Sequence, residues 1–388
     1  MNLALSGNAA VAYAMHQINP HVVAVYPITP QTVAMERFAD YVADGDVDTE
    51  LIMADSEHSA MSCCIGASLA GARVMTSTAS AGLALMWEVL YVAASNRCPI
   101  VMNVMNRALS APINIHCDHS DAMGARDSSW IQLHAENVQE AYDNIIQAIR
   151  IAEHENVRLP VMTNMDGFTL SHATERLTVL ENKQVQDFIG DFTALYPLLD
   201  VENPVTYGPL DLYDYYFEHK RQQVEAMELA PDVIVKVGEE YGSLSGRPYT
   251  KIVPFMMDDA DIAVIVLGST AGTARVAVKA MREKGVKVGM IKIRMFRPFP
   301  VEELKKSLKG VKAIMVMDRS DSYGAFGGPV FSEIRSVMQK EDTDIINYIY
   351  GLGGRDIRQD QIEQAITETA QIAKTGKVKT YVNYLGVR

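Results

Sequence analysis

Cysteine is scarce in this sequence, and its spacing excludes one class of cofactor. The 388 residues include four cysteines, Cys63, Cys64, Cys98 and Cys117, and no two of them form a C-x-x-C pair. An iron–sulfur cluster usually takes four thiolates, several of them closely spaced. We therefore do not expect this chain to hold a cluster. Cys63 and Cys64 fall in a helical pattern, where free cysteine behaves as a small core residue.

The sequence also lacks clustered positive charge and long apolar runs. Its formal net charge is −13, which argues against nucleic acid as a partner because phosphate binding needs clustered Lys and Arg. No run approaches the roughly 18 apolar residues of a membrane span. No lysine or arginine precedes Arg37, so the charged start of a signal peptide is missing. We expect a cytoplasmic protein with no membrane contact.

Apolar strands and helical patterns alternate through the first 166 residues. Continuous apolar strands separated by helices are typical of a parallel sheet with helices on both faces. The expected strands are 22–26, 51–54, 74–77, 100–104 and 159–164, and the expected helices are 8–17, 31–41, 57–70, 82–94 and 138–154.

This alternation lapses between Asp166 and about Pro254, and a second α/β unit follows. The lapse contains several prolines and a helix expected over 210–229, which is typical of an excursion that wraps its own domain or a partner. We therefore divide the chain into domains at 1–250 and 251–388. The second unit predicts strands at 262–267, 288–293, 313–317 and 345–350, and helices at 270–284, 301–308, 330–338 and 361–373.

Polar residues gather where the expected strands of the first domain end. The segment Tyr26-Pro27-Ile28-Thr29-Pro30 follows the first strand, and its two prolines stop the strand and hold a rigid turn. Ligands bind at the carboxyl edge of α/β sheets, so the segments at these ends are candidates for one site. Three further segments come at the ends of later βα units: Ser56–Ala60, Asn106–Ala108 and Asp118–Asp121.

Together these four segments resemble the α subunit of the pyruvate:ferredoxin oxidoreductases, a branch of the thiamine-diphosphate-dependent 2-oxoacid:ferredoxin oxidoreductases. The resemblance implies a pyrimidine-binding domain followed by a domain like the C-terminal domain of transketolase. It runs along nearly the whole chain, through Thr76–Thr78, Asp166–Phe168, Gly268-Ser269, Phe296–Pro300, Met317–Arg319 and Gly351–Asp356.

Glu57 is the candidate catalytic residue. An acidic residue in the first turn of a helix also complements the helix dipole, so the residues alone leave a structural explanation open. The resemblance implies that this carboxyl group hydrogen-bonds N1′ of the cofactor's aminopyrimidine and exchanges a proton with it. It also implies cofactor contacts from Tyr26, Pro27, Ile28, Thr78 and Ser80.

Thr29 and Arg107 are the candidate substrate-binding residues. A guanidinium presents forked donors that match the carboxylate of a 2-oxoacid, and the resemblance assigns both residues to the substrate. The alternative is a structural ion pair of Arg107 with Asp118 or Asp121. No metal is expected in the loop from 108 to 121, because its His and Asp spacing fits no common ligand pattern.

One motif that the resemblance leads us to expect is missing. Thiamine diphosphate enzymes hold the diphosphate through a divalent metal bound at a Gly-Asp-Gly motif and a downstream Asn, and Gly-Asp-Gly does not occur here. The resemblance therefore implies a partner β subunit that supplies the diphosphate and Mg²⁺ side. It also implies ferredoxin-like γ and δ subunits with [4Fe-4S] clusters, and ferredoxin and coenzyme A as reactants.

The expected function is that of the α subunit of an enzyme that oxidatively decarboxylates pyruvate. Coenzyme A takes the acetyl group, carbon dioxide leaves, and ferredoxin takes the electrons. The same reaction can also run in reverse. One alternative is the same chemistry on 2-oxoisovalerate, 2-oxoglutarate or oxalate. Others are the β subunit of a 2-oxoacid dehydrogenase E1 component and a scaffold subunit that only docks partners.

Overall fold

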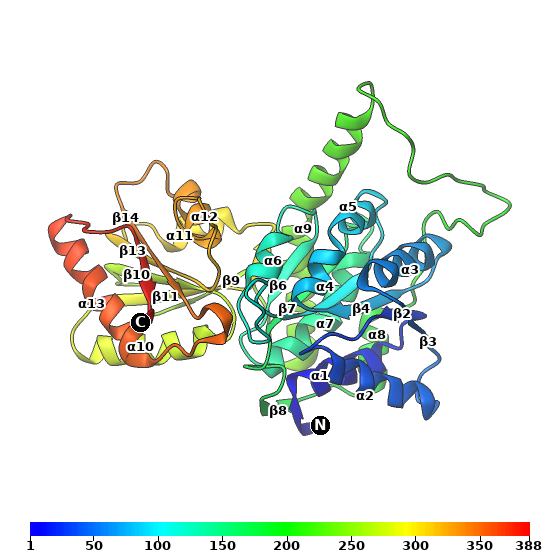
Figure 1. Cartoon of the computed structure of the whole chain (residues 1–388), viewed down its shortest axis with the longest axis horizontal. Coiled ribbons are helices and arrows are strands. Elements are labelled where there is room, and N and C mark those ends of the chain that lie inside the picture. Colours follow the sequence, from blue (N-terminus) through cyan, green and yellow to red (C-terminus); the bar gives the residue numbers. More distant parts are fainter.

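Two layered α/β domains lie side by side in the computed structural model, which describes residues 1–388 (Figure 1). The larger domain is built on a seven-stranded sheet in which every pairing is parallel except that of the edge strand β12. In spatial order its strands are β12 (Met295–Arg297), β6 (Ile131–His134), β7 (Val161–Asp166), β5 (Val101–Asn106), β4 (Val74–Thr78), β2 (Val22–Val25) and β3 (Glu50–Met53).

Helices cover both faces of this sheet, which confirms the predicted class of fold. On one face, 45 buried apolar residues form the core with α1 (Gly7–Ile18), α2 (Thr32–Ala43), α7 (Val138–Glu153), α8 (Asn182–Ile189) and α9 (Tyr216–Ser245). A second core of 19 residues lies under α3 (Glu57–Ala70), α4 (Ser80–Leu85) and α5 (Trp87–Ser95) on the other face. The short helix α6 (Ser120–Gly124) lies beyond the end of β5, and β1 (Asn2–Ser6) pairs with β8 (Thr174–Thr178) outside the main sheet.

The five strands predicted for this domain are present, but two helix predictions are wrong. The helix expected over 82–94 is interrupted at Met86, between α4 and α5. The helix expected over 210–229 begins later and ends sixteen residues later, as α9, with Pro231 inside it. Proline normally interrupts a helix because it lacks a donor. Here the buried side chains of Ala230, Val233 and Ile234 hold the helix against the core across the proline.

The second domain repeats the layered plan on a six-stranded sheet. Nineteen buried apolar residues lie on each face of it. In spatial order the strands are β15 (Val382–Leu385), β14 (Asp344–Tyr350), β13 (Ala313–Asp318), β10 (Ile262–Val266), β11 (Val288–Ile293) and the antiparallel β9 (Ile252–Phe255). The helices are α10 (Thr270–Glu283), α11 (Val301–Ser307), α12 (Pro329–Val337) and α13 (Gln359–Thr375), with a 3₁₀ turn η1 (Leu352–Gly354).

Buried polar contacts tie the two domains together. Asp166, at the end of β7, accepts hydrogen bonds from Arg319 at 2.7 Å and from the backbone of Ser269 at 3.1 Å, both in the second domain. His119 Nε2 lies 2.7 Å from its other carboxylate oxygen. Burial raises the pKa of Asp166, but His119 and Arg319 outweigh it and hold that pKa well below its usual range. An ionised carboxylate therefore links the two units, and β12, from the chain after 251, extends the first sheet.

No helix in this structure combines the length and the apolar character needed to cross a membrane.

Candidate functional site

Four turns meet at the carboxyl edge of the first sheet, as the order of the strands requires. Because β7, β5, β4, β2 and β3 are parallel neighbours, the segments that follow them leave the sheet at the same edge. Gly167 makes one contact between these turns possible. A Cβ built there would lie 2.4 Å from the carbonyl oxygen of Asn106 and 2.9 Å from Pro30 Cγ. The turns after β2, β5 and β7 are therefore in direct contact.

Glu57 is the first residue of α3 and is 6% exposed. The helix does not need its side chain as a cap, because the hydroxyl of Ser56 accepts the backbone N–H of Ser59 at 3.1 Å. The carboxylate extends instead over Gly82 toward Thr78. A Cβ at Gly82 would lie 2.6 Å from Glu57 Oε1 and 2.5 Å from Thr78 Oγ1. That hydroxyl is buried and has no hydrogen-bond partner, so a carboxyl group and an unpaired hydroxyl lie together at the base of the turn.

Arg107 and Thr29, predicted to lie near each other, are in contact. Arg107 Nη1 donates to the carbonyl oxygen of Thr29 at 3.0 Å, and its Nε donates to that of Asn114 at 2.8 Å. The guanidinium forms neither of the ion pairs weighed from the sequence, because Asp121 binds only the backbone N–H of Arg107, at 2.9 Å. Asp118 accepts from Ser120 and Gly353 instead. Nη2 thus remains available at the edge of the site.

Asp121 belongs to a segment that the sequence placed at this edge, but its role there was not predicted. One carboxylate oxygen accepts the backbone N–H groups of Ser80 at 3.0 Å and Arg107 at 2.9 Å. The other accepts from the side chain of Asn106 at 3.0 Å and from the backbone of Ala122 at 2.7 Å. The carboxylate therefore joins the turn after β4 to the turn after β5. Burial raises the pKa of Asp121 to about 6, against the effect of these donors.

The other predicted cofactor residues lie in the same turns but differ in how accessible they are. Tyr26 and Pro27 are exposed and Ile28 is half-buried, on the turn that follows β2. Ser80 is fully buried, and its hydroxyl donates to the carbonyl oxygen of Ala108 at 2.6 Å. Its hydrogen bonds hold the turn, so a direct cofactor contact from Ser80 stays a prediction.

Comparison with known proteins first identifies the class of the chain. Residues 13–239 match the family model described as pyruvate flavodoxin/ferredoxin oxidoreductase, thiamine diphosphate-binding. Residues 260–362 match the pyruvate:ferredoxin oxidoreductase core domain II. The first domain is therefore a thiamine diphosphate-binding domain, and the chain belongs to the pyruvate:ferredoxin oxidoreductase family.

Several relatives align over almost the whole chain. Pyruvate synthase subunit PorA of Thermotoga maritima is 53% identical over 100% of this chain and 98% of its own length. PorA of Methanocaldococcus jannaschii is 45% identical, with 93% of each chain covered. Ketoisovalerate oxidoreductase subunit VorA of Pyrococcus abyssi is 41% identical over 98% of this chain and 96% of its own length.

Two solved structures share the fold. A 2-oxoglutarate:ferredoxin oxidoreductase from Magnetococcus marinus superposes with a TM-score of 0.74 at 20% identity. The match covers 95% of this chain and 65% of that one. A split-gene transketolase, an inactive β4 tetramer, gives a TM-score of 0.56 at 13% identity, covering 96% of this chain and 100% of that one. These likenesses confirm the predicted class of fold, and the thiamine diphosphate-binding character of the first domain comes from the family match.

The residues around Gly82 fit the pyrimidine end of thiamine diphosphate. An aminopyrimidine presents ring nitrogens and an amino group, which need hydrogen-bond partners when buried. The carboxyl group of Glu57 and the unpaired hydroxyl of Thr78 can serve them, and the missing Cβ of Gly82 leaves the space between. Of the residues named, Glu57 and Thr78 are the ones that would hold the ring.

The cluster Cys117, His119 and Asp166 brings three metal-ligating side chains within 4.8 Å of one another, yet its chemistry does not suit a cation. Arg319 already places a guanidinium on Asp166. Burial raises the pKa of the Cys117 thiol well above its usual value, so the thiolate that binds metals is disfavoured. This cluster joins the two domains, and the absence of metal from the loop 108–121 stays a prediction.

Gly82→Ala tests the contact between Glu57 and Thr78. Because the new Cβ would fall within 2.6 Å of both side chains, we expect Glu57 to be displaced and thiamine diphosphate to bind the assembled enzyme at least tenfold more weakly, or roughly 1.4 kcal/mol. Calorimetric titration with the cofactor measures this. Gly272→Ala on α10 is the matched control, since a Cβ at that helical glycine would meet only Glu136 Oε1, at 4.0 Å. Equal cofactor affinity in the two variants would contradict the placement of Glu57.

Asp121→Asn tests the link between the two turns through its pH dependence. The carboxylate is ionised above about pH 6, so the variant should lower kcat/KM most at pH 8 and progressively less toward pH 5. The contribution of Asp121 to the free energy of unfolding should change with pH in the opposite direction. Because the folded pKa of Asp121 is raised, this group's contribution is fully present below about pH 4 and is lost as pH rises through 6. A wild-type to variant ratio of kcat/KM that does not change with pH would refute the role.

Proposed function

We propose that this chain is the α subunit of a pyruvate:ferredoxin oxidoreductase, in which it holds the pyrimidine side of thiamine diphosphate and the carboxylate of pyruvate. The observation that carries the proposal is the position of Glu57 and Arg107 at one sheet edge, in a chain of this family. The 53% identity to a pyruvate synthase subunit favours pyruvate. The family match favours this function over an E1 β subunit or a scaffold.

The chain's own residues supply positioning and proton transfer. When bound, thiamine diphosphate supplies the carbon nucleophile that attacks the ketone of the substrate. Glu57 holds N1′ and exchanges a proton with it, which is general acid–base catalysis. Arg107 directs its free Nη2 to the substrate carboxylate, and the hydrogen bond to the carbonyl of Thr29 keeps the guanidinium in place. Asp121 fixes the backbone on which Arg107 stands.

The rest of the reaction belongs to partner subunits. A β subunit supplies the diphosphate and Mg²⁺ side, since this chain has no Gly-Asp-Gly motif. Oxidation of the two-carbon unit that remains after carbon dioxide leaves yields two electrons, and [4Fe-4S] clusters in γ and δ subunits would supply their route to ferredoxin. Coenzyme A accepts the acetyl group, and the name "subunit" carried by the relatives supports an assembly of this kind.

The purified native complex tests this function directly. Its iron–sulfur spectrum should change to that of the reduced clusters when pyruvate and coenzyme A are added together. 2-Oxoisovalerate is the informative competitor, because a ketoisovalerate oxidoreductase subunit is 41% identical to this chain. A higher kcat/KM with 2-oxoisovalerate than with pyruvate would reassign the substrate, and no reduction by either acid would refute the proposal.

Glu57→Gln tests the proton transfer. An amide keeps the shape but cannot exchange the proton, so C2 proton exchange of the bound cofactor should slow by roughly 10²–10⁴-fold, as measured by NMR in the assembled complex. Subunit assembly should be unchanged. Exchange at the wild-type rate would mean that Glu57 serves only the start of α3.

Arg107→Ala and Arg107→Lys separate substrate binding from structure. Loss of the forked donor should lower kcat/KM for pyruvate by about 10²-fold or more in the alanine variant. Lysine should restore activity only in part, because a point charge lacks the fork. Cofactor affinity should be nearly unchanged in both. A lowered melting temperature with unaltered kinetics would instead assign Arg107 to holding Thr29 and Asn114 in place.

A further inference from the structure

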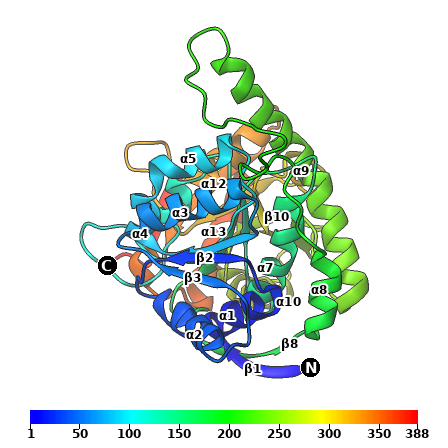
Figure 2. The same ribbon diagram turned by 90° about the vertical axis from the view of Figure 1, so that its right-hand side faces the viewer.

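The helices on one face of the first domain carry almost no charge. Together α3, α4 and α5 contain no lysine or arginine, and their only acidic residues are Glu57 and Glu88. A helix that borders solvent normally carries charged residues on its outer side. Here the outer side of α3 exposes Ser62 and Gly66, while α5 exposes Trp87 and Val92. We refer to this surface as the α3–α5 face (Figure 2).

A long arm projects next to this face. The arm comprises residues 191–217, between α8 and the first turn of α9, and stands out from the domain in Figure 1. Eleven of the 29 exposed large apolar side chains of the whole chain lie in it, including Leu210 at 90% and Tyr213 at 91% exposure. It also carries five acidic residues and no basic one. Apolar side chains gathered on one surface in this way mark an interaction site.

The arm is attached where the α3–α5 face ends. The backbone N–H of Leu198 donates to the carbonyl oxygen of Leu69, near the end of α3, at 2.8 Å. Arg158 donates to the carbonyl oxygen of Thr193 at 3.2 Å. Both α3 and α5 start at the carboxyl edge of the sheet, where Glu57 lies, and run back to the opposite edge. This face, on which Glu88 is the one exposed acidic side chain, therefore leads continuously from the carboxyl group of Glu57 to the arm.

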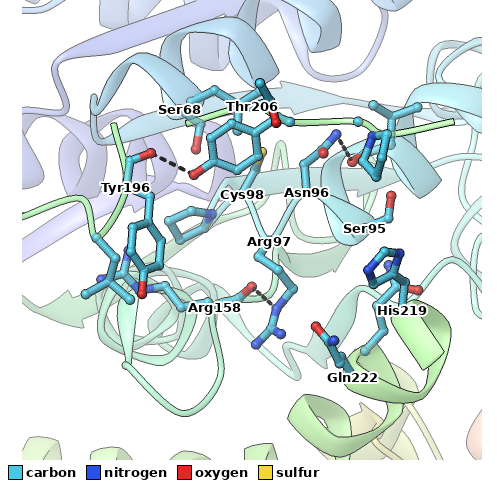
Figure 3. Close-up of a pocket in the computed structure, with 18 of the residues that line it drawn as sticks. Ser68, Ser95, Asn96, Arg97, Cys98, Arg158, Tyr196, Thr206, His219 and Gln222 are labelled. Carbon is cyan, nitrogen blue, oxygen red and sulfur yellow. Dashed lines mark hydrogen bonds between the residues drawn. The ribbon is translucent and has the colours of Figure 1, made fainter. Parts of the chain in front are cut away.

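A cavity of about 850 Å³ opens between the arm and the domain, at the edge of the sheet opposite Glu57. Figure 3 shows Arg97 and Arg158 with Tyr196 and Thr206 of the arm around it. Arg97 donates to the backbone carbonyl of Arg158 at 3.0 Å, and neither arginine belongs to a salt bridge. Arg158 lines this cavity, and its Nε is buried without a hydrogen-bond partner, so the cavity has room for an inserted side chain beside an arginine with unused hydrogen-bonding capacity.

We propose that the α3–α5 face and the arm form one docking surface for the subunit that supplies the diphosphate side of the cofactor site. This inference rests on the proposed two-subunit site. That subunit must approach Glu57 at the start of α3, and the uncharged helices continue from that point to the arm. The arm closes over the bound subunit at the end of the α3–α5 face that is farthest from Glu57. An apolar segment of that subunit, carrying a hydrogen-bond acceptor, enters the cavity.

A second copy of this chain is a poorer occupant on the same evidence. It lacks the Gly-Asp-Gly motif and has a net charge of −13, so an arm with five acidic residues would meet a surface of the same sign. The diphosphate-binding partner is therefore expected to present basic groups around an apolar centre where it meets the arm.

Two variants test the surface without disturbing the isolated chain. Gly66→Arg places a charge on the exposed side of α3, where a Cβ meets nothing within 4 Å. Leu210→Asp with Tyr213→Asp removes the most exposed apolar groups of the arm. Each should weaken association of the full chain with the diphosphate-binding subunit by at least about tenfold in analytical ultracentrifugation. The melting temperature of the isolated chain should not change.

Val276→Arg is the matched control, because Val276 is an exposed apolar residue on α10 of the other domain. This variant should associate with the diphosphate-binding subunit as tightly as the wild-type chain does.

Hydrogen exchange of the assembled enzyme should show protection of α3, α5 and the arm relative to the isolated chain. Wild-type association of both variants would overturn the proposal. Protection of the arm only when the chain associates with itself, or with another subunit, would overturn the chosen occupant. The Glu57→Gln complex should assemble normally, so loss of docking is distinguishable from loss of chemistry.

Discussion

The candidate site depends on one buried carboxylate more than on any residue that faces a ligand. Asp121 accepts N–H groups from the turn after β4 and from the turn after β5, which are otherwise separate loops. Its second oxygen binds Asn106 and the start of its own helix. Four donors fix this side chain, so the backbone that carries Arg107 cannot move without breaking several buried hydrogen bonds. The position of Arg107, the proposed substrate-binding residue, is thus fixed by a residue that does not itself face the substrate.

The parallel sheet made part of this site predictable, because strand ends at one edge bring together residues far apart in sequence. Tyr26–Pro30, Glu57 and Arg107 were found in that way. The segment Asp118–Asp121 was placed at this edge too, but the role of Asp121 was not predicted, because the sequence suggested only an ion pair and its four hydrogen bonds involve mainly backbone groups. The length of α9 was missed for a similar reason: the packing of Val233 and Ile234 outweighs the local effect of Pro231. Long-range packing leaves no periodic signal in a single sequence.

A chain proposed to hold only the pyrimidine half of a cofactor site must also leave a surface open for the subunit that supplies the other half. The buried polar links between its two domains, centred on Asp166, join them through contacts made within the chain itself. The surface proposed for the partner lies elsewhere, on α3, α4 and α5. These helices lack most of the charges that solvent-facing helices usually carry. Small residues on α3 let another chain approach its backbone closely.

Helix α3 therefore connects assembly to chemistry. Its first residue carries the carboxyl group expected to contact the cofactor, its outer side is uncharged, and its last turn binds the arm through the carbonyl of Leu69. A helix is stiff along its axis. A subunit that packs against the side of α3 and is held by the arm at the last turn therefore also fixes the position of the first residue of α3. Docking along α3 would therefore bring the partner subunit's half of the proposed cofactor site against Glu57.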